Sequence, residues 1–341
     1  MISNRYKANG REVFTLFKKG IEVKRIINQK ISSGEWKLIN RECECGNNDY
    51  EILSEKNKYG IPQRIQICKE CGLIFYSPAL DHESTVDFYV NYYNDLCAAS
   101  ITPKELFYYQ YQRGLKVLEF LEVHQEVINF SRVSTILEIG TGTGGILKAI
   151  KDKYPHLKAF GTEYRDEEIS IAKKNGIATV KGDIETFINE NGGKIDLIIL
   201  NHVMEHFIDI SDELEKIRRI MHEHSVLLVG VPGVMHTHKF YESFLESISL
   251  DHNYFFTSRT LNYIMNKNGF KHLYIDEDVN ALYKLSGTYQ HDVPRDEYER
   301  VTHYLGALEK KANRPLAKLR SLRVEYRQLL KNVILNIIDK R

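Results

Sequence analysis

Three carboxylates stand at the ends of three successive apolar segments, each with the pattern of a buried strand. Glu138 lies two residues before a glycine-rich loop, Glu163 ends the segment AFGTE, and Asp183 follows ATVKG. In an open parallel sheet, ligands bind outside the carboxyl ends of the strands, so these side chains are expected to face one ligand. Carboxylates attract positive charge and accept hydrogen bonds from diols and amines, so the trio predicts a cationic ligand that is rich in donors.

The glycine-rich loop, GTGTGG at 140–145, fits two known spacings. Gly140, Gly142 and Gly144 give GxGxG, whereas Gly145 in third place gives the GxGxxG of nicotinamide dehydrogenases. A dehydrogenase would place a pyrophosphate on the following helix, where the negative charge of Glu138 brings no gain. We therefore expect S-adenosylmethionine instead of the dinucleotide of a dehydrogenase or epimerase. Its amino acid, ribose and adenine would be bound at the ends of the first, second and third strands.

Two histidines follow the fourth apolar segment, in the stretch NHVMEH at 201–206. Methyl transfer from a sulfonium is an in-line displacement that depends mainly on bringing donor and acceptor together. A hydroxyl acceptor must also lose its proton, and a histidine suits that role near neutral pH. His202, Glu205 and His206 lie at i, i+3 and i+4, on one face if a helix begins there. For His206 the roles of base, metal ligand and structural residue stay open, and His252 in DHNYFF is a second candidate.

Four of the five cysteines form two close pairs, Cys43 with Cys45 and Cys68 with Cys71. The N-terminus lacks the pattern of a signal peptide and no long apolar run occurs, so we expect a cytoplasmic protein with reduced thiols. Structural zinc takes four thiolates from two such pairs, which 22 residues separate here. The alternation of apolar residues around the second pair predicts two strands joined by a metal-binding knuckle.

The elements that must position these residues follow from the pattern of the whole chain. Apolar strands alternate with amphipathic helices over 135–290, which predicts an α/β fold with a doubly wound, mostly parallel sheet covered by helices on both faces. We expect the other segments to be a basic helical region at 1–42 with a helix at 13–31, a zinc ribbon at 43–80, an aromatic-rich helical linker at 81–134 and a basic amphipathic helix at 295–341.

From about Thr135 to Gly287 the chain resembles the class I S-adenosylmethionine-dependent methyltransferases. The family's E-x-G-x-G-x-G motif corresponds to 138–144, its ribose-binding acid to Glu163 and its adenine-side acid to Asp183, in the family's order. The resemblance implies a cofactor site formed by Glu138, Gly140, Thr141, Gly142, Gly144, Glu163, Tyr164, Asp183, Ile184 and Asn201.

From Cys43 to Gly287 the succession of ribbon, linker and core also resembles bacterial methyltransferases of nucleotide sugars, surface polysaccharides and antibiotic sugars. Similar sugar enzymes place a histidine at the position of His206, which implies His206 as the base, with His202 and His252 as further catalytic candidates. The sugar C-methyltransferases carry a further large carboxyl-terminal domain, whereas 54 residues follow Gly287 here. We therefore expect O-methylation of a nucleotide sugar or saccharide, with C-methylation as an alternative.

The segment around 202–206 also resembles the ubiquinone-pathway O-methyltransferases. In that family the positions of His202, Glu205 and His206 are Glu, Glu and His, and the cluster is associated with a divalent metal. The histidine at the first position is a departure from that pattern.

The charge distribution suggests further binding partners besides a small-molecule substrate. Segments 1–42 and 295–341 each carry a net charge of about +6, and the residues between them about −11. Basic ends and a zinc module would suit an RNA methyltransferase, but Glu44, Asp49, Glu51 and Glu70 surround the cysteines and argue against nucleic acid. A non-catalytic scaffold is disfavoured by the intact loop motif. The terminal helix, with Leu319, Leu329, Val333 and Ile337 on one face, has three open roles: pairing with another copy, packing on the core or contact with an anionic membrane.

Overall fold

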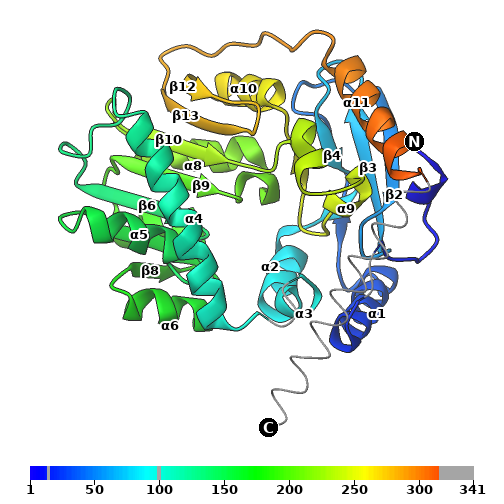
Figure 1. Cartoon of the computed structure of the whole chain (residues 1–341), viewed down its shortest axis with the longest axis horizontal. Coiled ribbons are helices and arrows are strands. Elements are labelled where there is room, and N and C mark those ends of the chain that lie inside the picture. Colours follow the sequence, from blue (N-terminus) through cyan, green and yellow to red (C-terminus); the bar gives the residue numbers. More distant parts are fainter. Residues whose placement is uncertain (14–15, 98–100, 315–341) are drawn as a thin grey trace.

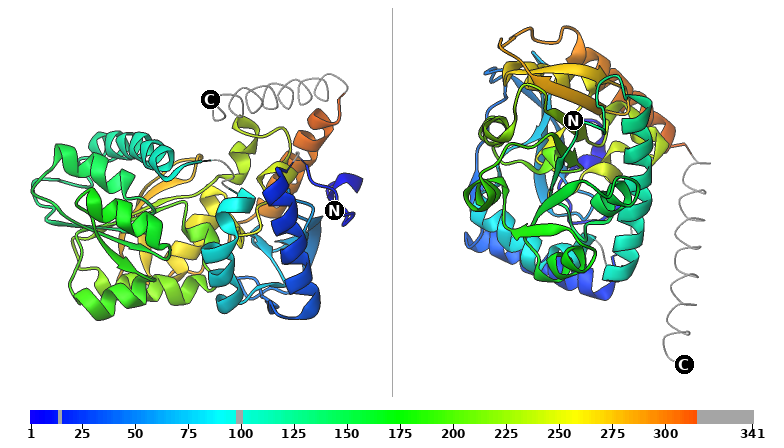
Figure 2. Two further views of the ribbon diagram at one scale, coloured as in Figure 1. Left: turned by 90° about the horizontal axis from the view of Figure 1, so that it is seen from below. Right: turned by 90° about the vertical axis from the view of Figure 1, so that its left-hand side faces the viewer.

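The computed structural model describes residues 1–13, 16–97 and 101–314. Within them the chain forms two units side by side, each built around its own sheet (Figures 1 and 2). The core unit contains a seven-stranded sheet. The other unit, called here the N-terminal unit, contains a four-stranded sheet and the short strand pair β1 (Leu38–Ile39) and β5 (Ala79–Leu80).

The core sheet has the strand order β12-β13-β10-β9-β6-β7-β8. Strands β10, β9, β6, β7 and β8 are parallel to one another, and β13 runs antiparallel beside β10. The predicted doubly wound, mostly parallel sheet is therefore confirmed. Its strands are β6 (Thr135–Ile139), β7 (Lys158–Glu163), β8 (Ala178–Lys181), β9 (Leu197–Asn201), β10 (Val226–Gly230), β12 (Phe270–Ile275) and β13 (Asn280–Leu285).

Helices cover both faces of this sheet because its strands present apolar side chains to both sides. Ile136 of β6 packs toward one face, with α4 (Pro103–Val123), α5 (Gly145–Lys153) and α6 (Asp166–Lys174). Leu137 packs toward the other face, with α7 (Ile184–Asn191), α8 (Ile210–Ile220) and α10 (Ser258–Lys267). Burial of each such side chain contributes about 1.5–3 kcal/mol, so the strands hold the loops at their carboxyl ends in fixed positions.

The N-terminal unit is built on an antiparallel sheet with the order β11-β4-β3-β2. Strands β2 (Tyr50–Lys56), β3 (Pro62–Cys68) and β4 (Ile74–Tyr76) are consecutive in the chain. Strand β11 (Tyr254–Phe255) comes from a distant segment, which the sequence analysis placed inside 135–290. The two-stranded knuckle expected around Cys68 and Cys71 corresponds to β3 and β4.

Helices from several distant parts of the chain pack on this unit. A cluster around Ile65 and Ile67 of β3 includes residues of η1 (Asn4–Tyr6), η3 (Val234–Lys239), α9 (Phe244–Ser247) and α11 (Glu297–Ala312). A second cluster joins α1 (Lys18–Ser33) to α2 (His82–Asn91) and α3 (Tyr93–Cys97). None of the described helices is long and apolar enough to cross a bilayer.

One expectation about the terminal segments differs from the structure, and the other concerns mostly residues outside the described ranges. The helix expected at 13–31 begins at Lys18, and within it Ile21 is 54% exposed, whereas Val23 and Ile27 are buried. The helix expected over 295–341 is described only as α11, so Leu319, Leu322, Tyr326, Leu329, Val333 and Ile337 lie outside the described residues.

Candidate active site

The glycine-rich loop joins β6 to α5 at the carboxyl edge of the core sheet. Gly140, Gly142 and Gly144 have φ values of +67°, +54° and +79°, in the left-handed region that a side chain would strain. Helix α5 starts at the next residue, so the loop ends at a helix N-terminus. This is the geometry expected of a nucleotide-binding turn.

Glu138 is buried beneath this loop, with 2% of its surface exposed. Its carboxylate accepts a hydrogen bond of 2.8 Å from the Thr141 hydroxyl. Thr141, which was predicted to bind the cofactor, therefore uses its side chain to hold Glu138 in place. Burial raises the pKa of Glu138 to about 8. A positively charged group beside this carboxylate would replace the proton, which fits the expected cationic ligand.

Glu163 ends β7 with its carboxylate fixed by backbone N–H groups. One oxygen accepts from Tyr164 at 2.8 Å and from Arg165 at 3.1 Å, and the other accepts from Gly142 at 3.1 Å. Each carboxylate oxygen can accept more than one hydrogen bond. Glu163 therefore fixes the glycine-rich loop and keeps acceptor capacity for a ribose diol.

The other predicted cofactor residues lie around the same edge. Asp183 is the N-cap of α7, and its Oδ1 accepts from the backbone N–H and the hydroxyl of Thr186, both at 2.9 Å. Burial raises its pKa, but these hydrogen bonds outweigh that effect and lower the pKa overall. Ile184 is fully buried in the core cluster, and Asn201 ends β9 with a buried amide nitrogen that has no hydrogen-bond partner among the described residues.

Helix α4 contributes a residue that the sequence analysis missed. The side-chain oxygen of Gln110 accepts a 2.9 Å hydrogen bond from the backbone N–H of Thr143, inside the glycine-rich loop. Helices α4 and α5 approach each other closely because glycines stand at the contact. A Cβ on Gly114 would lie 2.7 Å from Ile146, and one on Gly145 would lie 2.6 Å from Gln110. The one available signal was Gly114 in the middle of an otherwise strongly helical segment.

The histidine-bearing turn follows β9, at the same edge of the sheet. His202 adopts a φ of +57° and is followed by the short helix η2 (Met204–His206). His206 Nδ1 lies 2.9 Å from the backbone oxygen of Asp251. A carbonyl oxygen only accepts, so Nδ1 donates this hydrogen bond, and in the neutral ring Nε2 carries the lone pair.

Two buried carboxylates flank His206. Glu205 Oε1 lies 3.8 Å from His206 Nε2 and 3.4 Å from His202 Nδ1, and Asp251 Oδ2 lies 3.6 Å from His206 Nδ1. Burial of the imidazole lowers its pKa, but the two carboxylates outweigh burial and raise the pKa of His206 above its usual value. A positive charge on this ring is therefore stabilised.

His252 completes the group, although it is distant in the chain. Its ring centre lies 5.0 Å from that of His206, and burial lowers its pKa to about 4, so it is neutral at physiological pH. Ligand atoms of Glu205, His206 and His252 all lie within 4.8 Å of one another. The structure thus brings together His202, His206 and His252, the three catalytic candidates of the sequence analysis.

An aromatic wall from α2 and α3 faces this histidine group. The Tyr89 ring lies edge-on to His206 with 6.0 Å between ring centres, and Tyr93 packs on Tyr89 at 5.5 Å. The Arg165 guanidinium stands over the Tyr93 ring at 5.6 Å. The N-terminal unit therefore meets the core unit where the reactive groups of the candidate site gather.

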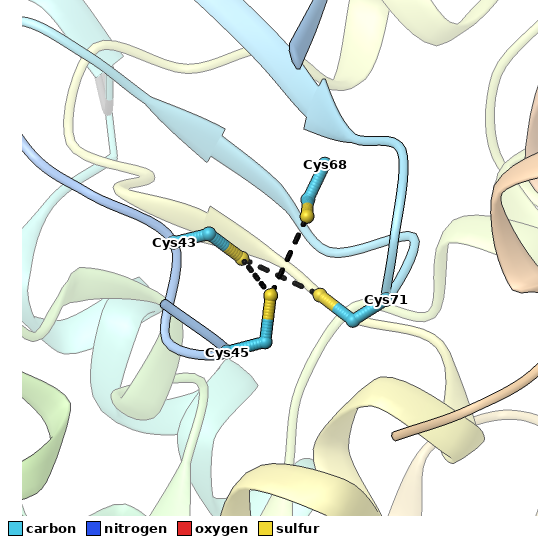
Figure 3. A group of neighbouring side chains, drawn as sticks. All are labelled: Cys43, Cys45, Cys68 and Cys71. Atoms are coloured by element: carbon cyan, nitrogen blue, oxygen red, sulfur yellow. Dashed lines mark hydrogen bonds between the residues drawn. The ribbon is translucent and has the colours of Figure 1, made fainter. Parts of the chain in front are cut away.

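The four cysteines converge although they come from segments 22 residues apart (Figure 3). The Cys43 and Cys71 sulfurs are 3.3 Å apart, and Cys45 lies 3.5 Å from both Cys43 and Cys68. Tetrahedral Zn–S bonds of about 2.3 Å require sulfurs about 3.8 Å apart, which this cluster meets with a small expansion. Cys97 is outside the group.

The cysteine cluster lies between the two units. Cys43, Cys68 and Cys71 are buried in the same apolar cluster as Tyr263 and Met265 of α10, a core-unit helix. Lys267, at the end of α10, donates a short hydrogen bond to the backbone oxygen of Glu44. The arrangement has the donor set and the burial of a structural metal centre.

Residues 109–275 match a family model described as a methyltransferase domain. No curated protein matches the chain in sequence. Among solved structures, the amino pentose methyltransferase CalS10 of Micromonospora echinaspora is 12% identical, covering 55% of this chain and 98% of that chain, with a TM-score of 0.40. The plantazolicin methyltransferase BpumL is 14% identical, covering 67% and 88%, with a TM-score of 0.45. The mitomycin 7-O-methyltransferase MmcR is 17% identical, covering 60% and 66%, with a TM-score of 0.39.

Proposed function

We propose that this S-adenosylmethionine-dependent methyltransferase, whose domain is matched over residues 109–275, methylates a hydroxyl group of a sugar. The family match and the strand order of the core sheet make the chain a methyltransferase. The acceptor and the roles of individual residues are the proposal. The sugar is a nucleotide sugar or the end of a growing saccharide.

The observation that carries the proposal is the histidine group at the end of β9. His206 keeps the Nε2 lone pair because Nδ1 is bonded to the Asp251 carbonyl. The charge that His206 would gain on taking a proton is balanced by Glu205 and Asp251. These are the requirements for a base that acts on a hydroxyl.

The proposed reaction is a single displacement. An oxygen lone pair of the acceptor attacks the methyl carbon, the C–S bond breaks with its electron pair on sulfur, and the hydroxyl proton passes to His206 Nε2. The chain's part is to hold donor and acceptor in line and to exclude water, which supplies most of the rate enhancement in such reactions. Glu138, Glu163 and Asp183 are proposed to hold the amino acid, ribose and adenine of the cofactor.

The acceptor class is argued from the aromatic wall. The Tyr89 ring contacts His206 in a T-shaped arrangement and packs on Tyr93, and the Tyr89 hydroxyl is buried without a hydrogen-bond partner among the described residues. An aromatic face packs on the C–H groups of a pyranose ring while a phenol supplies a hydrogen bond. A polyhydroxylated ring suits both features.

The four cysteines are proposed to hold a structural zinc ion. When bound, the ion would tie the loop at Cys43 and Cys45 to the end of β3, beside α10. Its role would be to hold the N-terminal unit, and with it Tyr89 and Tyr93, against the core unit.

The test is His206→Ala assayed with S-adenosylmethionine and a panel of nucleotide sugars, with S-adenosylhomocysteine release and product mass as readouts. We expect normal cofactor affinity and a loss of turnover of about 10²–10⁴. His224→Ala, which changes an exposed histidine paired with Glu223, serves as the matched control and should keep full turnover. Full activity in His206→Ala would reject the base. A methyl group found on carbon would replace O-methylation by the C-methylation alternative.

A further inference from the structure

The carboxylate of Glu205 is an anomaly in the candidate site. The residue is 1% exposed, and neither of its oxygens has a hydrogen-bond partner among the described residues. A buried ionised carboxylate without short hydrogen bonds is costly, because it has lost its hydration and keeps only the longer contacts to His202 and His206. Histidine nitrogens stand at 3.4 Å and 3.8 Å from Oε1. The 3.8 Å separation is too long for a hydrogen bond.

The 3.8 Å separation between Glu205 Oε1 and His206 Nε2 suits an ion held between the two groups. Metal–ligand bonds of about 2.0–2.2 Å place two ligands of one ion about 3–4 Å apart. The three donor groups, from Glu205, His206 and His252, lie within 4.8 Å of one another. His206 Nε2 keeps its lone pair because Nδ1 is anchored to the Asp251 carbonyl, which is the usual way that proteins orient a ligating imidazole.

We propose that Glu205, His206 and His252 bind a divalent first-row transition cation at the acceptor side of the active site. Two imidazoles and one carboxylate form a donor set that Zn²⁺, Mn²⁺ and Fe²⁺ accept, and open positions remain for water or a substrate oxygen. This set differs from the face His202, Glu205 and His206 considered from the sequence, because His252 comes from another segment and His202 is 43% exposed.

Binding of the ion does not depend on the proposed function, but its role in catalysis rests on the proposed O-methylation. An acceptor hydroxyl bound to a divalent cation has a lowered pKa, so its proton can leave to water. The resulting oxygen attacks the methyl carbon, and the sulfur keeps the electron pair of the broken C–S bond. In the loaded enzyme His206 Nε2 would then hold the ion, and direct proton uptake by His206 would belong to the ion-free enzyme.

Binding is tested with Mn²⁺ alone, on the full chain freed of adventitious metal, by loss of the free-ion signal in electron paramagnetic resonance. Manganese prefers oxygen and nitrogen ligands to thiolates, so the cysteine cluster does not compete. We expect one Mn²⁺ per chain. Glu205→Gln and His252→Ala should each weaken binding at least about 10-fold, a loss seen even when outer partners of ligands are removed.

His224→Ala is the control and should keep the Mn²⁺ affinity, because this exposed side chain does not belong to the group. Cofactor affinity and melting temperature of Glu205→Gln, measured in parallel, separate a lost ligand from a damaged fold. Unchanged Mn²⁺ binding in Glu205→Gln, or no binding by the wild type, would overturn the inference while O-methylation stands. Normal Mn²⁺ binding with no sugar methylated would instead reject the proposed function.

Discussion

At the scale of single residues, Glu138 makes a testable link between pH and cofactor binding. Its pKa is raised to about 8 by burial, so the ligand-free protein carries a proton there at neutral pH. Between pH of about 4.5 and 8 the folded chain binds more protons at this group than the unfolded chain does, so the group's contribution to stability falls as pH rises through that window. A cationic ligand favours the ionised carboxylate and expels the proton.

We therefore predict that affinity for S-adenosylmethionine rises between pH 6.5 and 8.5, by up to about tenfold per pH unit below the pKa of Glu138. Titration calorimetry in two buffers of different ionisation enthalpy should also detect proton release at pH 7. In Glu138→Gln the pH dependence should disappear, because the amide does not titrate. A wild-type affinity that is flat across this range would contradict the proposed contact between Glu138 and the cofactor.

The residues of the candidate site differ in how far their positions could be predicted from the sequence. The position of Glu138, Glu163 and Asp183 at one edge of the sheet was predictable, because each lies at or just after the carboxyl end of a strand whose apolar pattern is strong. Asp251 and Gln110 were not, because their contacts with the site cross between distant segments and no local pattern encodes them. The burial of Ile184 and the hydrogen bond of Thr141 to Glu138 likewise depend on packing that only the structure defines.

At the scale of elements, the contact between α4 and α5 depends on glycines. A Cβ on Gly145 would lie 2.6 Å from both Gln110 Cβ and the backbone nitrogen of Tyr111. Gly145→Ala should therefore push α4 away from the glycine-rich loop, cost about 1–3 kcal/mol of folding stability and weaken cofactor binding. Chemical denaturation and calorimetry would measure the two effects.

Gly306→Ala is the matched control for this prediction. Gly306 lies within α11, and a Cβ there would meet nothing within 4 Å. The change should leave cofactor binding unaltered and add up to about 1 kcal/mol of stability, because alanine favours the helix. If both variants behaved alike, the close approach of α4 would have no energetic importance.

Most elements of the core unit could be predicted because their apolar periodicity is clear. The strand β11 could not, because two residues carry too little pattern to show which sheet they join. The start of α1 was misplaced because Val13, Phe17 and Ile21 imitate a helical stripe that leads to Ile27, whereas the helix begins at Lys18 and buries Val23 with Ile27.

At the scale of the whole molecule, the cysteine cluster is expected to join the two units. Removal of the proposed zinc ion should loosen their contact, because Cys43, Cys68 and Cys71 pack against α10 of the core unit. We predict that Cys71→Ser lowers the zinc content and reduces the free energy of unfolding by more than about 4 kcal/mol, as expected when a structural metal is lost. Elemental analysis and calorimetric melting would measure both.

Cys97→Ser is the control for that prediction, since Cys97 lies outside the cluster. It should keep full zinc content and a melting temperature near that of the wild type. A Cys71→Ser protein that melts like the wild type and retains one zinc ion per chain would show that the cluster does not bind the metal.

The pairing of β11 with β4 also limits how the chain can be divided. Strand β11 lies between β10 and α10 in the sequence but hydrogen-bonds to the N-terminal unit. A fragment that starts after Cys97 would keep Tyr254 and Phe255 while losing the sheet that covers them, and would expose an apolar edge prone to aggregation. A fragment that ends at Cys97 would lack β11, the edge strand of the four-stranded sheet. Each half of this protein therefore depends on the other for solubility, and expression trials should use the intact polypeptide.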